Sequence, residues 1–196
     1  MIRILPWITD GAVTFLDGFI GTFEKEKPKV FEFGIGNSSL YFLQRGCSVT
    51  GVDHDTEWAK KVRATSELFG LGKRLNISIA ERPYYRSYTG NGYDIISIDG
   101  RDRVKCLEYV VNCEWKSGSI LLLDNTERVW SGRYSEYIGL LQDFEIIHFE
   151  QPRIFGVSAQ LANHLDRAGS NVGHRWVTTI AWRKGDRPRT TFGTHL

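Results

Sequence analysis

Cysteine is scarce in this chain of 196 residues, which has three: Cys47, Cys106 and Cys113. Their number is odd, and they form neither a CxxC pair nor the Cys/His spacing of a metal site. A disulfide-stapled secreted scaffold carries a denser, even set of cysteines, so the sequence argues against that class. We expect free, buried thiols in a protein of a reducing compartment.

Long apolar runs and a surplus of one charge are also missing. No stretch reaches the ~20 apolar residues that a membrane span requires, and Asp10 and Asp17 interrupt the apolar start that a signal peptide would need. The 25 basic and 23 acidic residues leave a formal net charge of +2, which gives no electrostatic basis for a nucleic-acid or membrane partner. We therefore expect a cytoplasmic protein with neither partner. No pattern indicates its oligomeric state.

What the sequence does contain is an alternation of short apolar segments with amphipathic ones. Val13, Leu16 and Ile20 recur at spacings of three and four, which predicts a helix over residues 9–24. Continuous apolar runs such as 120–123 are typical of parallel strands buried on both faces. The predicted strands are 29–33, 48–52, 75–80, 93–98, 119–123, 145–149 and 177–182, and the other predicted helices are 40–44, 56–69, 104–114 and 134–141.

Strands separated by helices of this length form βαβ units. We therefore predict an α/β fold: a single Rossmann-like domain over residues 1–184, with a mostly parallel sheet and helices on both faces. The last strand is expected to run antiparallel at the end of the sheet, and residues 185–196 to form a disordered tail. The connection over residues 150–175 is long and lacks periodicity, which is typical of a lid or binding loop, or of a plain surface excursion.

The first strand ends in a segment suited to a ligand, because ligands of such folds bind beyond the carboxyl ends of the strands. Gly34 and Gly36 let the backbone turn and approach a ligand, and the helix that follows offers free N–H groups at its N-terminus. Glu32 lies inside the apolar strand itself, where an unpaired carboxylate is costly to bury. The ammonium group of an amino-acid ligand would supply the partner that Glu32 needs.

The second strand ends in Asp53, followed by His54 and Asp55. A carboxylate at this place can accept hydrogen bonds from both hydroxyls of a ribose. The alternative is that Asp53 or Asp55 caps the helix that starts near Thr56. Since Asp55 can do this alone, we favour a ligand role for Asp53.

These two segments resemble motifs one and two of the class I S-adenosylmethionine-dependent methyltransferases. The first is Glu32-Phe33-Gly34-Ile35-Gly36-Asn37-Ser38-Ser39 and the second is Val52-Asp53-His54-Asp55. Pro6-Trp7-Ile8-Thr9 and the strand ending at Trp182 extend the likeness to a poorly characterised bacterial branch of that class, so it covers most of the chain. In that branch a Ser or Thr commonly replaces the third glycine, and here that residue is Ser39.

The resemblance implies an enzyme of the EC 2.1.1 type with S-adenosylmethionine as its cofactor. It implies that Glu32 contacts the methionine amino group, that Asp53 holds the ribose, and that Ala80 and Glu81 flank the adenine. The cofactor-binding residues expected on this basis are Glu32, Gly34, Gly36, Asn37, Ser38, Ser39, Asp53, His54, Ala80, Glu81 and Asp99.

Other functions remain open at this point. A nicotinamide-dependent oxidoreductase would want a third glycine at position 39, which is Ser39, and would give no reason for Glu32. An aminopropyltransferase that uses decarboxylated S-adenosylmethionine would share the fold, and Glu32 does not exclude it. A non-catalytic binding module would tolerate the loss of the acidic residues at the later strand ends.

Acidic residues also follow the fourth and fifth strands: Asp99, and the pair Asp124 and Asn125. Three hard oxygen ligands above one sheet edge can hold Mg²⁺, which would lower the pKa of a substrate hydroxyl. The pattern resembles the catechol and caffeoyl-coenzyme A type O-methyltransferases, where such residues bind the metal. Those enzymes often place a lysine base three residues after the first Asp, and Asp102 stands there. The alternative is a metal-free site in which Asp99 and Asp124 cap helices or bind the substrate.

The expected reaction is methyl transfer to an unknown small-molecule acceptor, at oxygen, with Asp99, Asp102 and Asp124 as the catalytic residues. Arg101, Arg103 and Arg128 are candidates to recognise a carboxylate or phosphate of the acceptor, or else to bridge the nearby acidic residues. Two histidines of the long connection, His164 and His174, are candidates for a general base.

Overall fold

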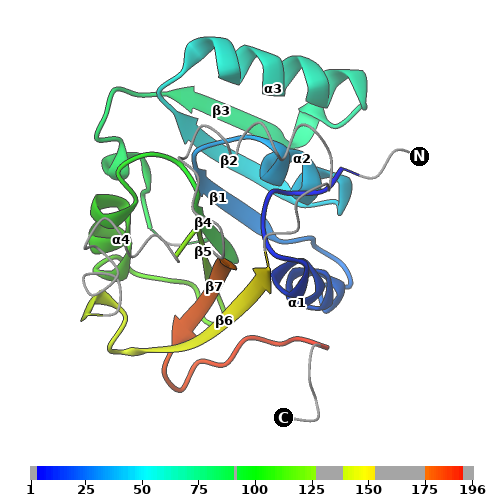
Figure 1. Ribbon diagram of the computed structural model, residues 1–196. Coiled ribbons are helices and arrows are strands. Elements are labelled where there is room, and N and C mark those ends of the chain that lie inside the picture. The colour runs from blue at the N-terminus through cyan, green and yellow to red at the C-terminus, as the bar shows by residue number, and fades with distance from the viewer. Residues whose placement is uncertain (1–3, 91, 127–138, 153–174, 192–196) are drawn as a thin grey trace.

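The computed structural model describes residues 4–90, 92–126, 139–152 and 175–191, which form a seven-stranded sheet with helices on both faces (Figure 1). Among the described residues are four α-helices and two short 3₁₀ turns, at Gly72–Arg74 and Tyr85–Ser87. The helices are α1 (Asp10–Gly21), α2 (Asn37–Gln44), α3 (Thr56–Leu68) and α4 (Arg103–Val111), and the strands are β1 (Lys29–Phe33), β2 (Ser48–Asp53), β3 (Leu75–Ile79), β4 (Ile95–Ile98), β5 (Ile120–Asp124), β6 (Phe144–Pro152) and β7 (Arg175–Arg183).

The strand order is β3-β2-β1-β4-β5-β7-β6. Strands β1 to β5 pair in parallel, and β7 runs antiparallel to both β5 and β6. The predicted α/β class, the mostly parallel sheet and the antiparallel last strand are therefore confirmed. The prediction that the last strand lies at the end of the sheet is wrong, because β7 is inserted between β5 and β6 and leaves β6 at the edge.

Two apolar layers sandwich the sheet. Side chains alternate between them along each strand, so that Val30 and Ile95 face one layer while Phe31 and Ile96 face the other. Helices α1, α2 and α3 cover the first face, and α4 covers the second together with Tyr84 from the connection after β3. Figure 1 shows α4 on the side of the sheet opposite α1 and α2. Burial on both faces explains why the strands read as continuous apolar runs.

Most predicted elements lie within a few residues of the observed ones. Four elements differ by three residues at one end: α2 begins earlier than predicted, α1 and α4 end earlier, and β6 extends to Pro152. The predicted helix 134–141 and the connection 150–175 lie largely outside the described residues, as do Arg128, His164 and His174.

The segment after β7 begins with contacts to the domain. The Asp186 carboxylate accepts hydrogen bonds from Ser117 Oγ at 2.7 Å and from the Gly118 amide at 2.9 Å. Residues 192–196 lie outside the described residues, so the predicted tail stays a prediction there. None of the described helices is long and apolar enough to span a membrane.

The three cysteines are free thiols, as predicted. Cys47 and Cys106 are fully buried, and Cys113 is half-buried. Burial raises the pKa of the Cys47 and Cys106 thiols to about 12, so both are protonated at neutral pH. They are packing residues of the core.

Candidate functional site

The carboxyl ends of the first five strands meet along one edge of the sheet. The pairing register places Phe33 beside Val52 and Ile98, and Ile98 beside Leu123. The residues that follow these strands are therefore neighbours in space. This edge therefore brings together three acidic residues that the sequence analysis took from separate segments: Asp53, Asp99 and Asp124.

Two glycines bring the ends of β1 and β4 into direct contact. Gly34 has a φ of +86°, and a Cβ on it would lie 2.4 Å from the Cα atom of Gly100. A Cβ on Gly100 would in turn lie 2.3 Å from the Tyr84 hydroxyl oxygen. The glycine at position 34 is thus required by both its backbone conformation and its packing. Gly36 is different, since its nearest contact would be 3.6 Å away, on Trp58.

Glu32 is fully buried at the end of β1. Its Oε2 atom accepts a hydrogen bond from the Ser39 hydroxyl, whereas its Oε1 atom has no hydrogen-bond partner among the described residues. Burial raises the pKa of this carboxyl from 4.5 to about 7, against the opposing effects of the hydroxyls of Ser39 and Ser38. A buried oxygen without a partner, on a carboxyl that is reluctant to ionise, is suited to receive a cationic donor.

The contacts of Ser39 give a reason for a serine at the position where a dinucleotide-binding fold has its third glycine. Its Oγ atom accepts a hydrogen bond from the Gly36 amide at 3.1 Å while donating to Glu32. The residue therefore caps the start of α2 and orients the carboxylate at once. Asn37 is half-buried and Ser38 buried in the first turn of the same helix, beside Glu32.

Asp53 organises the ends of β1 and β2. Its carboxylate accepts hydrogen bonds from the amides of Ile35 (3.2 Å), His54 (2.7 Å) and Asp55 (3.0 Å). The Nδ1 atom of His54 lies 3.1 Å from Asp53 Oδ1. As predicted, Asp55 alone caps α3, by accepting from the Trp58 amide at 2.9 Å. These contacts fix the orientation of the Asp53 carboxylate before any ligand arrives.

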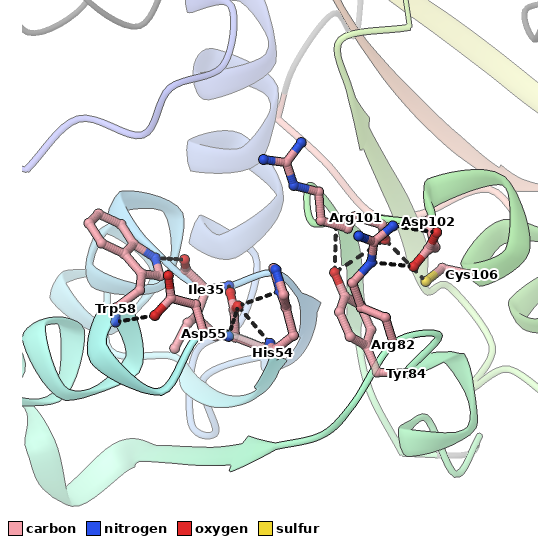
Figure 2. A network of polar contacts seen from close by, with 10 residues as sticks. Ile35, His54, Asp55, Trp58, Arg82, Tyr84, Arg101, Asp102 and Cys106 are labelled. Atoms are coloured by element: carbon pink, nitrogen blue, oxygen red, sulfur yellow. Dashed lines mark hydrogen bonds and ion pairs between the residues drawn. The ribbon is translucent and has the colours of Figure 1, made fainter.

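The indole of Trp58 packs against the turn that contains Gly34 and Gly36. Its Nε1 atom donates to the Ile35 carbonyl at 2.6 Å, and its ring lies over Gly36. Figure 2 shows this contact beside His54 and Asp55. The end of β3 lies next to it, since the Ala80 amide donates to the Asp53 carbonyl at 3.0 Å. Ala80 is half-buried and Glu81 exposed at this end.

A second network ties the connection after β3 to the end of β4 (Figure 2). The Tyr84 hydroxyl accepts a hydrogen bond from the Arg101 amide at 2.5 Å and donates to the Arg101 carbonyl at 3.2 Å. The Arg101 side chain is exposed and points away from Asp102. The Tyr84 ring lies 6.1 Å from that of His54, between centroids, so the two networks adjoin.

Asp102 does not have the geometry of a general base. Both of its carboxylate oxygens are held by Arg82, at 2.7 and 2.8 Å, and this pairing lowers the pKa of Asp102. A base needs a pKa near the working pH and an oxygen that faces the proton to be removed. The catalytic role predicted for Asp102 is therefore not supported, because the residue acts as a link between the β3 and β4 ends.

The ends of β4 and β5 are joined by Arg103. Its guanidinium donates to Asp99 Oδ1 at 2.7 Å, to the Asp124 carbonyl at 2.6 Å and to Asn125 Oδ1 at 3.2 Å. The Asp124 side chain is buried and accepts from Thr178 Oγ1 of β7 at 3.0 Å. The three residues predicted as metal ligands therefore do come together, around an arginine.

Known structures share this arrangement of strands. They include the cofactor-bound protein Rv0187 from MTB, with a TM-score of 0.64 and 15% identity over 93% of this chain and 83% of that one. The O-methyltransferase TomG from Streptomyces achromogenes in complex with S-adenosylmethionine is also similar (TM-score 0.59, 12% identity, 81% and 74% coverage). An O-methyltransferase from Bacillus cereus in complex with S-adenosylhomocysteine matches with a TM-score of 0.57 and 15% identity over 80% and 74% of the two chains. No family model and no curated protein matches the sequence.

The chain has the class I methyltransferase fold. Within this fold, the residues at the β1 and β2 ends fit S-adenosylmethionine. Glu32 offers an ammonium group a buried oxygen that has no hydrogen-bond partner among the described residues, and Asp53 is oriented by three amides at the place expected for a ribose.

The residues at the β4 and β5 ends do not fit Mg²⁺, which the likeness to metal-dependent O-methyltransferases had implied. The Oδ1 atoms of Asp99 and Asn125, which would be ligands of an ion, already accept hydrogen bonds from the Arg103 guanidinium. The tentative metal site of Asp99, Asp124 and Asn125 is thus not supported.

The sequence indicates a bridging role for Arg103 at this edge of the sheet, but not the roles of Arg82 and Thr178. Arg103 was proposed only for anion recognition or for bridging, and the second of these alternatives describes its contacts with Asp99 and Asn125. Arg82 and Thr178 were not singled out, because no spacing rule links them to residues 20 and 54 positions away. The one available signal was the surplus of arginine beside the acidic strand ends.

Proposed function

We propose that this chain is an S-adenosylmethionine-dependent methyltransferase that acts at an oxygen of a small-molecule acceptor. The observation that carries the proposal is Glu32: it is fully buried at the β1 end of a methyltransferase fold and has one oxygen without a partner among the described residues. An isolated buried carboxylate is costly. A ligand with an ammonium group at this point would offset that cost.

Three strand ends would share the cofactor in this proposal. Glu32 would accept a hydrogen bond from the methionine amino group, and Asp53 from the ribose hydroxyls. The first turn of α2, with Asn37, Ser38 and Ser39, would present its backbone to the methionine moiety. Ala80 and His54, which contact Asp53, and Glu81, which follows Ala80, would border the adenosine.

The cofactor supplies the reactive methyl group, since its sulfonium makes the methyl carbon electrophilic. The protein contributes orientation of the two reactants, an effect worth about 7–11 kcal/mol at most in well-aligned systems. On the acceptor side, Asp124 and Asp99 stand at the β5 and β4 ends. The buried Asp124 carboxylate, held by Thr178, is suited to orient an acceptor hydroxyl and to take up its proton as the methyl group is transferred.

An oxygen acceptor is favoured by two observations. Carboxylates line the acceptor side, and they accept the hydrogen bond of a hydroxyl group. Two of the similar structures are described as O-methyltransferases.

Calorimetric titration of the purified protein with S-adenosylhomocysteine tests the cofactor assignment. NADH and decarboxylated S-adenosylmethionine serve as parallel controls for an oxidoreductase and an aminopropyltransferase. We expect micromolar binding of S-adenosylhomocysteine and none of NADH. Tight binding of NADH, or preference for the decarboxylated compound, would replace the proposal with the corresponding alternative.

A further inference from the structure

The Arg103 side chain makes an unusually complete set of contacts. It is the first residue of α4, and its guanidinium reaches across the ends of β4 and β5. Nε donates to the Gly100 carbonyl at 3.0 Å. Nη1 donates to the Asp124 carbonyl and to Asn125 Oδ1, and Nη2 to the carbonyl and Oδ1 of Asp99, at 2.8 and 2.7 Å. A guanidinium has five N–H donors, and all five are used.

This environment is the one that a hard cation would require. Around one positive charge the chain gathers a carboxylate oxygen, an amide oxygen and three backbone carbonyls, which are the ligand types of Mg²⁺ and Ca²⁺. The Arg103 side chain is 16% exposed, so its charge is largely withdrawn from water. An arginine cannot lose its proton in a protein, so a metal ion at these oxygens would have to displace a fixed charge.

We propose that Arg103 is the resident cation of the acceptor side of this site and replaces a divalent metal in organising it. It is a positioning residue, since it uses all its donors within the protein. Its bond to Asp99 fixes the first residue after β4, and its bond to Asn125 stabilises a residue whose φ of +57° is unusual for a non-glycine. The catalytic meaning of this positioning rests on the proposed function, whereas the cation replacement itself does not.

The replacement predicts how the protein responds to divalent ions. Wild-type protein should bind neither Mn²⁺ nor Mg²⁺ at this place, and EDTA should leave its thermal midpoint unchanged. Arg103→Ala removes the guanidinium and leaves the oxygen ligands of Asp99 and Asn125 facing one another. We expect this variant to have a lower midpoint in EDTA, to bind Mn²⁺ roughly tenfold or more tightly than wild type, and to recover part of the lost midpoint when Mg²⁺ is added.

Arg101→Ala is the matched control, because Arg101 lies two residues away and its exposed guanidinium has no ion-pair or hydrogen-bond partner in the described part of the chain. It loses the same charge and should change neither the midpoint nor Mn²⁺ binding. Arg103→Lys provides a second variant that keeps the charge with fewer, differently placed donors. It should still exclude Mn²⁺ and be less stable than wild type.

Electron paramagnetic resonance of Mn²⁺ and thermal unfolding, each with and without Mg²⁺, measure these effects in the full chain. Mn²⁺ binding to Arg103→Ala alone supports the proposal. Binding to the wild type, equal binding to Arg101→Ala, or no gain in a folded Arg103→Ala would overturn it. Should Arg103→Ala fail to fold, Mn²⁺ binding by wild type or by Arg103→Lys still overturns the proposal, and its exclusion from both supports it. S-adenosylhomocysteine titration of the same samples reports separately on the proposed function.

Discussion

At the scale of single residues, the protonation of Glu32 couples stability to pH. Its pKa is raised from 4.5 to about 7 by burial, so between these values the folded state holds a proton that the unfolded state releases. The stabilising effect is complete below pH 4.5 and is lost as the pH rises through 7. The free energy of unfolding therefore falls by up to about 1.4 kcal/mol per pH unit in this window.

The variant Glu32→Gln tests this linkage, because its neutral amide does not ionise. Without cofactor, we expect the free energy of unfolding of wild type to fall relative to the variant between pH 5 and pH 8. Urea denaturation at intervals of one pH unit measures the difference. Glu108→Gln, an exposed change on α4, is the control and should show no such trend. Parallel curves for wild type and Glu32→Gln would contradict the raised pKa.

Asp53 has two tasks, one in the protein and one proposed for the ligand. Its three amide contacts mean that removal of the carboxylate also leaves buried donors without partners, which costs about 1–3 kcal/mol. We expect Asp53→Asn to lower the thermal midpoint by a few degrees and to weaken S-adenosylhomocysteine binding at least about tenfold. Calorimetry at a temperature where the variant is folded separates the effects. Undiminished affinity would remove Asp53 from the ribose site.

At the scale of elements, the turn from β1 to α2 predicts opposite results for its two glycines. Gly34→Ala places a Cβ against the Gly100 backbone in a left-handed conformation, and we expect it to destabilise the fold by about 2 kcal/mol or more. Gly36→Ala meets only ordinary contact with Trp58 and should be nearly as stable as wild type. Chemical denaturation of both variants checks the contrast, and equal losses of stability would contradict it.

The sequence predicted these elements well where a local pattern determines them. The apolar run of β1 and the glycines after it were recognisable, as was the capping of α3 by Asp55. The insertion of β7 between β5 and β6 could not be recognised, because an antiparallel strand has the same apolar pattern at the edge of a sheet as inside it. For a related reason, the sequence did not predict that Asp102 pairs with Arg82 and Asp99 with Arg103. Spacing identifies which residues reach an edge, but it does not say which charges neutralise one another there.

At the scale of the whole molecule, Thr178 joins three elements. Its hydroxyl, on β7, donates to Oδ1 of Asp124, the last residue of β5, and accepts from the Thr9 amide before α1, both at 3.0 Å. All three residues are buried. Thr178→Val keeps the shape but loses both bonds, so we expect a loss of about 1–3 kcal/mol in the free energy of unfolding. The neighbouring change Thr14→Val, on the exposed side of α1, is the control.

The central claim, that Glu32 receives the amino group of S-adenosylmethionine, is tested most directly by one comparison. S-adenosylhomocysteine and methylthioadenosine, which lacks the amino-acid group, are titrated calorimetrically into wild type and Glu32→Gln at pH 8. The account predicts that the variant loses roughly tenfold or more in affinity for S-adenosylhomocysteine and none for methylthioadenosine. Equal losses for the two ligands, or no loss for either, would contradict it.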